Sequence, residues 1–206
     1  MIDLYTWSTP NGRKISIMLE ECGLAYNVRP IDISKNEQFG DEFIAINPNS
    51  KIPAIVDHDG DRGTPFVLFE SGAILIYLAE KVGRFLPATP IARYQTLQWL
   101  MFQMSGVGPS FGQAHHFMRA AKEHVPYGIE RYGKEAVRLY GVMNDRLGKT
   151  AFLAGDVYTV ADIATFPWIA RHEWHRVDLT TFPNVARWFG EVGSRPAVIK
   201  GMRIPA

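Results

Sequence analysis

The sequence predicts two domains: an α/β domain at residues 1–84 and an all-helical domain at 91–206, joined by a linker at 85–90. Strand-like and helix-like segments alternate up to residue 84, two prolines mark the linker, and only helical periodicity follows it. The order strand–helix–strand–helix–strand–strand–helix predicts a mixed sheet with helices on its faces.

Local signals predict each element of the first domain. Ser8 or Thr9 caps a helix that accepts Pro10 in its first turn, and Gly23 ends that helix. Pro30 indicates an edge strand, because proline cannot donate to a central ladder. The expected strands are 2–6, 26–33, 54–57 and 66–69, with helices after residue 9, around 38–45 and from Glu70–Ser71 to Gly83, and a Gly/Asp-rich loop at 57–65.

The second domain shows helical signals throughout. Thr159 and Asp162 stand at the T-x-x-D spacing of a helix cap, directly before an apolar run. Three apolar faces recur at helical spacing, namely Leu97–Leu100–Met101–Met104, Leu139–Val142–Met143 and Val185–Trp188–Phe189–Val192. We therefore expect no strand after the linker.

Charge and cysteine content exclude several function classes. Lys and Arg number 22 against 21 Asp and Glu, and this balance of +1 predicts neither a nucleic-acid nor a membrane partner. The first residues do not form a secretory signal, and the chain has a single cysteine, Cys22, which excludes a disulfide framework and a multi-cysteine zinc site. We expect Cys22 to pack with Ile15, Met18 and Leu19, and the protein to be cytoplasmic.

The turn after the first strand carries candidate anion-binding chemistry. Thr9 and Asn11 supply side-chain donors where a helix N-terminus presents free amides, an arrangement that stabilises an anion such as a thiolate. Helix capping alone also explains these residues, and it is their commoner role.

Two later turns suggest recognition of a peptide and of an amino-acid head group. A cis bond before Pro53 would turn the Ile52 main chain outward to pair with a peptide, with Lys51 beside it for a carboxylate; a trans bond is the commoner alternative. Ser71 at a helix N-terminus suits a carboxylate and Glu70 an ammonium group, while simple helix capping is again the alternative.

Taken together and in this order, these motifs resemble the cytosolic glutathione transferases. The resemblance spans essentially the whole chain and includes the helical-domain motif Val160–Ala164. Four stretches are similar to the bacterial Nu class, which itself resembles a yeast nitrogen-regulating prion protein: Thr9–Gly12, Phe39–Pro53, Phe69–Ile74 and Gly112–Phe117. The resemblance implies a thioredoxin-like N-terminal domain, an all-helical C-terminal glutathione-transferase domain, and a homodimer.

The resemblance also implies the site residues, with glutathione as co-substrate. Thr9 and Asn11 would be catalytic, lying beside the glutathione sulfur. The glutathione-binding residues would be Asn11, Gln38, Lys51, Ile52, Pro53, Glu70, Ser71 and Arg131. For Arg131, a solvent-exposed helix charge is the alternative.

The implied function is that of a glutathione-dependent disulfide-bond reductase and glutathione transferase acting on a small disulfide or electrophile. The glutathione thiolate would be stabilised by Thr9, Asn11 and a helix N-terminus, without a protein cysteine. The alternative is a non-catalytic glutathione-binding regulatory or interaction module, which would not need an intact site. We expect no metal site, because the pairs His115–His116 and His172–His175 lack the spacing or the further ligands for one.

Overall fold

The computed structural model describes residues 1–60 and 63–205, so part of the loop expected at 57–65 lies outside the described residues. Its contacts divide the chain into a first unit, Met1–Arg84 together with the segment from Arg195 onward, and a second unit, Phe85–Ser194. The boundaries expected at 84 and 90 stay a prediction. The final segment, expected with the helical domain, packs with the first unit instead.

The first unit contains a four-stranded sheet in the order β2-β1-β3-β4. The strands are β1 (Ile2–Thr6), β2 (Tyr26–Pro30), β3 (Ala54–Asp57) and β4 (Phe66–Phe69). β2 is parallel to β1 at the edge, as the proline in it predicts, and β3 is antiparallel to both β1 and β4. β1 and β4 therefore run in the same direction.

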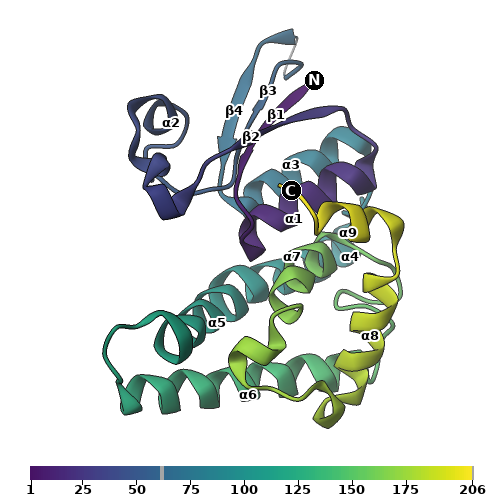
Figure 1. Ribbon diagram of the computed structural model, residues 1–206. Coiled ribbons are helices and arrows are strands. Elements are labelled where there is room, and N and C mark those ends of the chain that lie inside the picture. Colours follow the sequence, from purple (N-terminus) through teal and green to yellow (C-terminus); the bar gives the residue numbers. More distant parts are fainter. Residues whose placement is uncertain (61–62, 206) are drawn as a thin grey trace. The chain divides into compact units, whose positions relative to one another are not determined.

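Helices cover both faces of this sheet. α1 (Pro10–Cys22) and α3 (Ser71–Val82) lie on one side, and α2 (Asp41–Ile46) lies on the other (Figure 1). Two short 3-10 helices, Ile33–Lys35 and Glu37–Phe39, precede α2. The predicted ends of α1 are confirmed: Thr9 is the N-cap, and Gly23 stops the helix in the left-handed conformation at φ 66°. The fully buried core of the unit includes Leu4, Ile15, Leu19, Ile55, Ile74 and Leu78.

The C-terminal helix α9 (Pro196–Gly201) packs on α1. The Ser16 hydroxyl donates to the Gly201 carbonyl over 2.7 Å, and the Arg195 guanidinium binds the buried Glu21 carboxylate at 2.6 and 2.9 Å. At Gly201 an added Cβ would lie 2.5 Å from the Ile17 Cα, so only glycine allows this approach of the two backbones.

Gly201→Ala is therefore expected to lower the free energy of unfolding by about 1–3 kcal/mol, because the α1–α9 contact must shift. Urea denaturation at neutral pH measures the change. Gly141→Ala is the matched control: a Cβ there meets nothing within 4 Å, so a small gain from helix propensity is expected. Equal stability of the two variants would contradict the close contact.

The second unit is helical throughout, and residues 85–194, all of them described, contain no strand. Its helices are α4 (Pro90–Phe102), α5 (Gly108–His115), α6 (Pro126–Leu147), α7 (Val160–Ile169) and α8 (Pro183–Gly193), with π-helical turns at Gln103–Val107 and His116–Ala120 and 3-10 turns at His172–His175 and Leu179–Thr181. In the part of the chain that the structure describes, no helix is long and apolar enough to cross a membrane.

The capping motif predicted for α7 is confirmed. The Asp162 carboxylate accepts from the Thr159 amide at 3.0 Å, and the Thr159 hydroxyl accepts from the Ala161 amide at 3.3 Å. Asp162 also accepts from the Leu153 amide and the Trp188 indole, both at 2.9 Å, so one buried carboxylate joins α7 to α8 and to the preceding loop. Within the apolar face of α4, Leu100 is fully buried, whereas Met101 is 47% exposed.

A buried histidine, His175, and a half-buried one, His115, lie side by side in the second unit. The His115 and His175 rings stack with centroids 4.5 Å apart, and the Tyr140 hydroxyl lies 3.0 Å from His175 Nδ1. Burial, aided by the Arg171 charge, lowers the pKa of His115 to about 4; burial, aided by His115, lowers the pKa of His175 to about 3. Both rings are therefore neutral at physiological pH. No group of three or more metal-ligating side chains occurs among the described residues.

The free energy of unfolding is expected to fall as the pH drops from about 6.5 toward 4. The reason is that these two histidines have lower pKa values in the folded chain than in the unfolded chain, so only the unfolded chain binds protons in this range. The stability is complete above pH 6.5 and declines as the pH approaches the folded pKa values. His115→Phe should make this decline shallower in urea titrations at several pH values. His124→Gln, at an exposed site, is the control and should leave the decline unchanged. If the free energy of unfolding falls with pH by the same amount in His115→Phe and in the wild type, this account is contradicted.

Candidate functional site

The three predicted turns meet at one edge of the sheet in the first unit. The register places Ala54, the first residue of β3, opposite both Tyr5 near the end of β1 and Phe69 at the end of β4. The turn into α1, the turn before β3 and the turn into α3 consequently start from the same edge. Strand direction alone thus brings Thr9–Asn11, Ile52–Pro53 and Glu70–Ser71 to one end of the domain.

The first turn combines a helix cap with possible donors. The Thr9 Oγ1 accepts from the Gly12 amide at 3.1 Å, so the hydroxyl hydrogen of Thr9 points away from the helix. Asn11 is the second residue of α1, at the positive end of the helix dipole. A Cβ at Gly12 would lie 2.3 Å from the Trp7 carbonyl oxygen, which explains the glycine. The capping role is real, and it leaves the hydroxyl able to donate.

The second turn contains a cis bond between Ile52 and Pro53, the rarer of the two alternatives. Asn47 stabilises the segment that leads to this bond. Its side-chain amide donates to the Lys51 carbonyl at 2.6 Å, and its side-chain oxygen accepts from the Asn49 amide at 2.9 Å. Among the described residues, no hydrogen bond involves the Ile52 main chain. Its amide and carbonyl are thus available to an extended ligand.

The third turn holds a residue in an uncommon backbone conformation. Glu70, the N-cap of α3, has φ 70° and ψ 109°, a region that disfavours side chains other than glycine and costs about 1–3 kcal/mol. The Glu70 side chain is exposed, whereas Ser71 is buried. This turn accordingly offers a carboxylate to solvent and a hydroxyl at the helix N-terminus.

Lys14 belongs to this site although no sequence motif pointed to it. It is 1% exposed, and its ammonium group donates to the Ser71 Oγ at 3.2 Å. Burial lowers the pKa of Lys14 to about 7, against an opposing effect of the Glu70 charge. One signal was present: Lys14 precedes the buried residues Ile17 and Met18 by three and four positions, which places it on the buried side of α1.

Two predicted site residues lie outside the three turns. Gln38 lies in the 3-10 helix Glu37–Phe39, and its side-chain oxygen is buried without a hydrogen-bond partner among the described residues. Arg131 lies on α6 in the second unit, in the lining of a cavity of about 420 Å³. The roles of both residues stay predictions.

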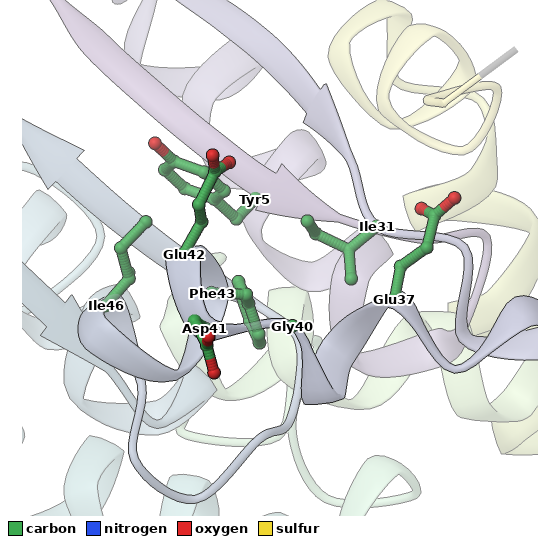
Figure 2. A pocket seen from close by; sticks show the side chains of 8 residues that line it. All are labelled: Tyr5, Ile31, Glu37, Gly40, Asp41, Glu42, Phe43 and Ile46. Atoms are coloured by element: carbon green, nitrogen blue, oxygen red, sulfur yellow. The ribbon is translucent and has the colours of Figure 1, made fainter.

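A cavity of about 380 Å³ in the first unit lies apart from the three turns. It is lined by Tyr5, Ile31, Glu37, Gly40, Asp41, Glu42, Phe43 and Ile46 (Figure 2), and these include none of the predicted site residues. The Tyr5 ring packs against Phe43 with centroids 6.1 Å apart, and burial raises the pKa of Tyr5. Tyr5 therefore contributes packing here and is not a ready proton donor or acceptor.

The single cysteine is poorly suited to be a nucleophile. Cys22, at the end of α1, is half-buried, and burial raises the pKa of its thiol to about 11. A thiol with that pKa is protonated at neutral pH, and only the thiolate attacks a disulfide. Sulfur chemistry at this protein must therefore use a sulfur from the ligand.

Comparisons with known proteins identify the family of both parts of the chain. Residues 9–81 match the family model of the glutathione S-transferase N-terminal domain, and residues 129–196 match that of the C-terminal domain. The Escherichia coli disulfide-bond oxidoreductase YfcG is 52% identical over 96% of this chain and 92% of its own. The Escherichia coli disulfide-bond oxidoreductase YghU is 42% identical over 97% of this chain and 73% of its own.

A crystal structure of a glutathione transferase from Pseudomonas putida, with one glutathione disulfide bound per subunit, has a TM-score of 0.95 and 45% identity, and the match covers 100% of this chain and 92% of that one. These matches confirm the predicted fold, a thioredoxin-like N-terminal domain followed by an all-helical domain. The chain belongs to the glutathione S-transferase family.

Proposed function

We propose that this protein is a glutathione-dependent disulfide-bond reductase and glutathione transferase that uses the sulfur of glutathione and no sulfur of its own. The observation that carries the proposal is the meeting of the Thr9, Ile52 and Ser71 turns at one sheet edge. The raised pKa of Cys22 supports it, since the chain has no other thiol. The names of the Escherichia coli relatives and the glutathione disulfide in the Pseudomonas putida enzyme favour the same reaction.

The proposed binding mode follows the three turns. The Ile52 amide and carbonyl pair with the main chain of the cysteinyl residue of glutathione. Ser71 holds the α-carboxylate of the γ-glutamyl residue, and Glu70 holds its ammonium group; the strained φ of Glu70 is typical of a residue placed for function. The remaining carboxylate of glutathione is bound by polar side chains from the predicted set Gln38, Lys51 and Arg131.

Thiolate stabilisation is the proposed catalytic contribution. An ordinary thiol has a pKa of about 8.5, so only a few per cent is ionised at neutral pH, and each unit of lowering requires about 1.4 kcal/mol. Thr9 donates its hydroxyl hydrogen to the sulfur, since its oxygen already accepts from Gly12. The Asn11 side-chain amide and the N-terminus of α1 add to this.

The reaction requires two glutathiones for each disulfide. The first thiolate attacks one sulfur of the substrate, forms a glutathione mixed disulfide and releases the other substrate sulfur as a thiolate, which takes up a proton. The second glutathione thiolate attacks the mixed disulfide, forms glutathione disulfide and releases the remaining substrate thiolate. The substrate gains two electrons and two protons, which the two glutathiones lose. This chemistry needs a pool of reduced glutathione, so we place the protein in the cytoplasm.

Thr9→Ala and Asn11→Ala are each expected to lower the rate of 2-hydroxyethyl disulfide reduction about tenfold, because each removes a hydrogen bond that favours the thiolate. The assay couples glutathione disulfide formation to glutathione reductase. Thr9→Ser, which keeps both the hydroxyl and the cap, should restore the rate, and Cys22→Ala should retain full activity. Unchanged rates in both alanine variants would contradict the mechanism; glutathione binding without any rate in the wild type would favour the non-catalytic module.

We also infer a homodimer. Ile91, Tyr94 and Met101 occupy one face of α4 and are 76%, 70% and 47% exposed, an apolar stripe typical of an interface. Tyr94→Arg is expected to shift the mass in sedimentation velocity from two chains toward one. Val157→Arg, at an apolar site outside α4 that is 61% exposed, is the control and should leave the mass unchanged. A wild type that sediments as one chain at all concentrations would refute the inference.

A further inference from the structure

The cavity of about 380 Å³ in the first unit is a second candidate site, separate from the three turns. Apolar and aromatic side chains form its walls, namely Tyr5, Ile31, Phe43 and Ile46. The Tyr5 side chain is only partly buried, so part of its surface is open to a ligand. A cavity of this volume accommodates a small molecule or one long side chain of a partner.

Three exposed carboxylates, those of Glu37, Asp41 and Glu42, line the same cavity, and none of them forms an ion pair within the described chain. Figure 2 shows Glu37 and Glu42 directed toward the same side of the cavity as the Tyr5 hydroxyl, and Asp41 directed toward the other. Glu37 is held in place, since its Oε2 accepts from the Asp32 amide at 2.6 Å. The cavity thus combines apolar walls with negative charge that no cation balances.

The helix dipole accounts for only part of this charge. Asp41 and Glu42 stand in the first turn of α2, where acidic side chains stabilise a helix N-terminus. Glu37 lies before α2, in the 3-10 helix Glu37–Phe39, so the dipole of α2 does not explain it. A capping role also requires no aromatic wall beside the carboxylates.

The Tyr5 ring favours a cation as the ligand, because an aromatic face attracts a cationic group and a guanidinium also stacks on it. Burial, with the charges of Asp3 and Glu42, raises the pKa of Tyr5, so negative charge acts at this ring. The Arg29 charge opposes this effect, but Arg29 pairs with Asp3 at 3.6 Å. An arginine side chain brings both a guanidinium for the carboxylates and an aliphatic stem for the apolar walls.

We propose that this cavity binds an arginine side chain of a partner polypeptide, with its guanidinium at Tyr5 and Glu42 and its aliphatic stem against Phe43. The apolar surface continues beyond the cavity, which favours a polypeptide over a free cation. Phe39 and Ile44, next in sequence to the lining residues 40–43, are 60% and 38% exposed. They would pack against apolar neighbours of the arginine. The proposal goes beyond the glutathione chemistry and does not depend on it.

The test uses a capped leucine–arginine–leucine peptide and its analogue with citrulline in place of arginine, which keeps the shape and removes the charge. NMR titrations of the isotopically labelled protein, without glutathione, should shift the Gly40 amide resonance with the arginine peptide. The citrulline peptide should bind at least about threefold more weakly. Glu42→Gln should weaken the arginine peptide about threefold and leave the citrulline peptide unchanged. Asp41→Asn, which removes a charge from the same helical turn but on the other side, is the matched control and should retain the affinity.

A second comparison separates a polypeptide partner from a free cation. Phe39→Ser should weaken the arginine peptide and leave the binding of butylguanidinium, which has only the cation and its stem, unchanged. Equal affinities of butylguanidinium and the arginine peptide for the wild type would overturn the assignment to a polypeptide. Equal affinities of the arginine and citrulline peptides, or no shift at Gly40 with either, would overturn the site itself. Thermal unfolding of each variant checks that it is folded.

Discussion

The register of β1, β3 and β4 is the constraint on which the candidate site depends. Because β3 runs against both neighbours, its first residue, Ala54, lies beside the last residues of the other two strands. Every binding group drawn from the three turns is within five residues of the strand end at this edge. A slip of one residue would move every side chain of the slipped strand to the other face and shift one turn away from the others. The buried residues Leu4 and Ile55 lock the register through the core.

The two helices that start at this edge are tied together by polar groups as well as by apolar packing. Lys14 reaches from α1 to the first residue of α3, while Thr9 closes the first turn of α1 on Gly12. A buried ammonium group is costly, and an apolar residue at that position would pack with less penalty. Its contact with Ser71 joins α1 to the N-terminus of α3 at the sheet edge where the candidate site lies.

The helix ends and caps could be predicted from the sequence because their signals are local. Thr9 and Gly23 mark helix ends by their own backbone preferences, and Thr159 with Asp162 forms a cap within four residues. The packing of α9 on α1 could not be predicted, because Ser16 and Gly201 are far apart in sequence and neither carries a distinctive pattern.

Lys14 escaped prediction for a different physical reason. A lysine on the buried side of a helix usually extends its ammonium group to water along its aliphatic stem, and the sequence does not reveal when a neighbouring helix covers that exit. The exposure of Met101 has a related cause, since helical spacing groups apolar residues on one face and does not show which of them the rest of the chain covers. Both depend on which surfaces meet, which no local pattern encodes.

The raised pKa of the Cys22 thiol and the cap at Thr9 indicate what the polypeptide contributes to a reaction between two sulfurs. If both reacting sulfurs come from ligands, the polypeptide forms no covalent intermediate and needs no second cysteine to release one. Its task is reduced to ionising one thiol and holding it in line with a disulfide. Donors fixed by the backbone perform that task with little reorganisation, because the Thr9 hydroxyl is oriented by the Gly12 amide before any ligand arrives. Selectivity then has to come from recognition of the rest of the ligand by the other groups at this sheet edge.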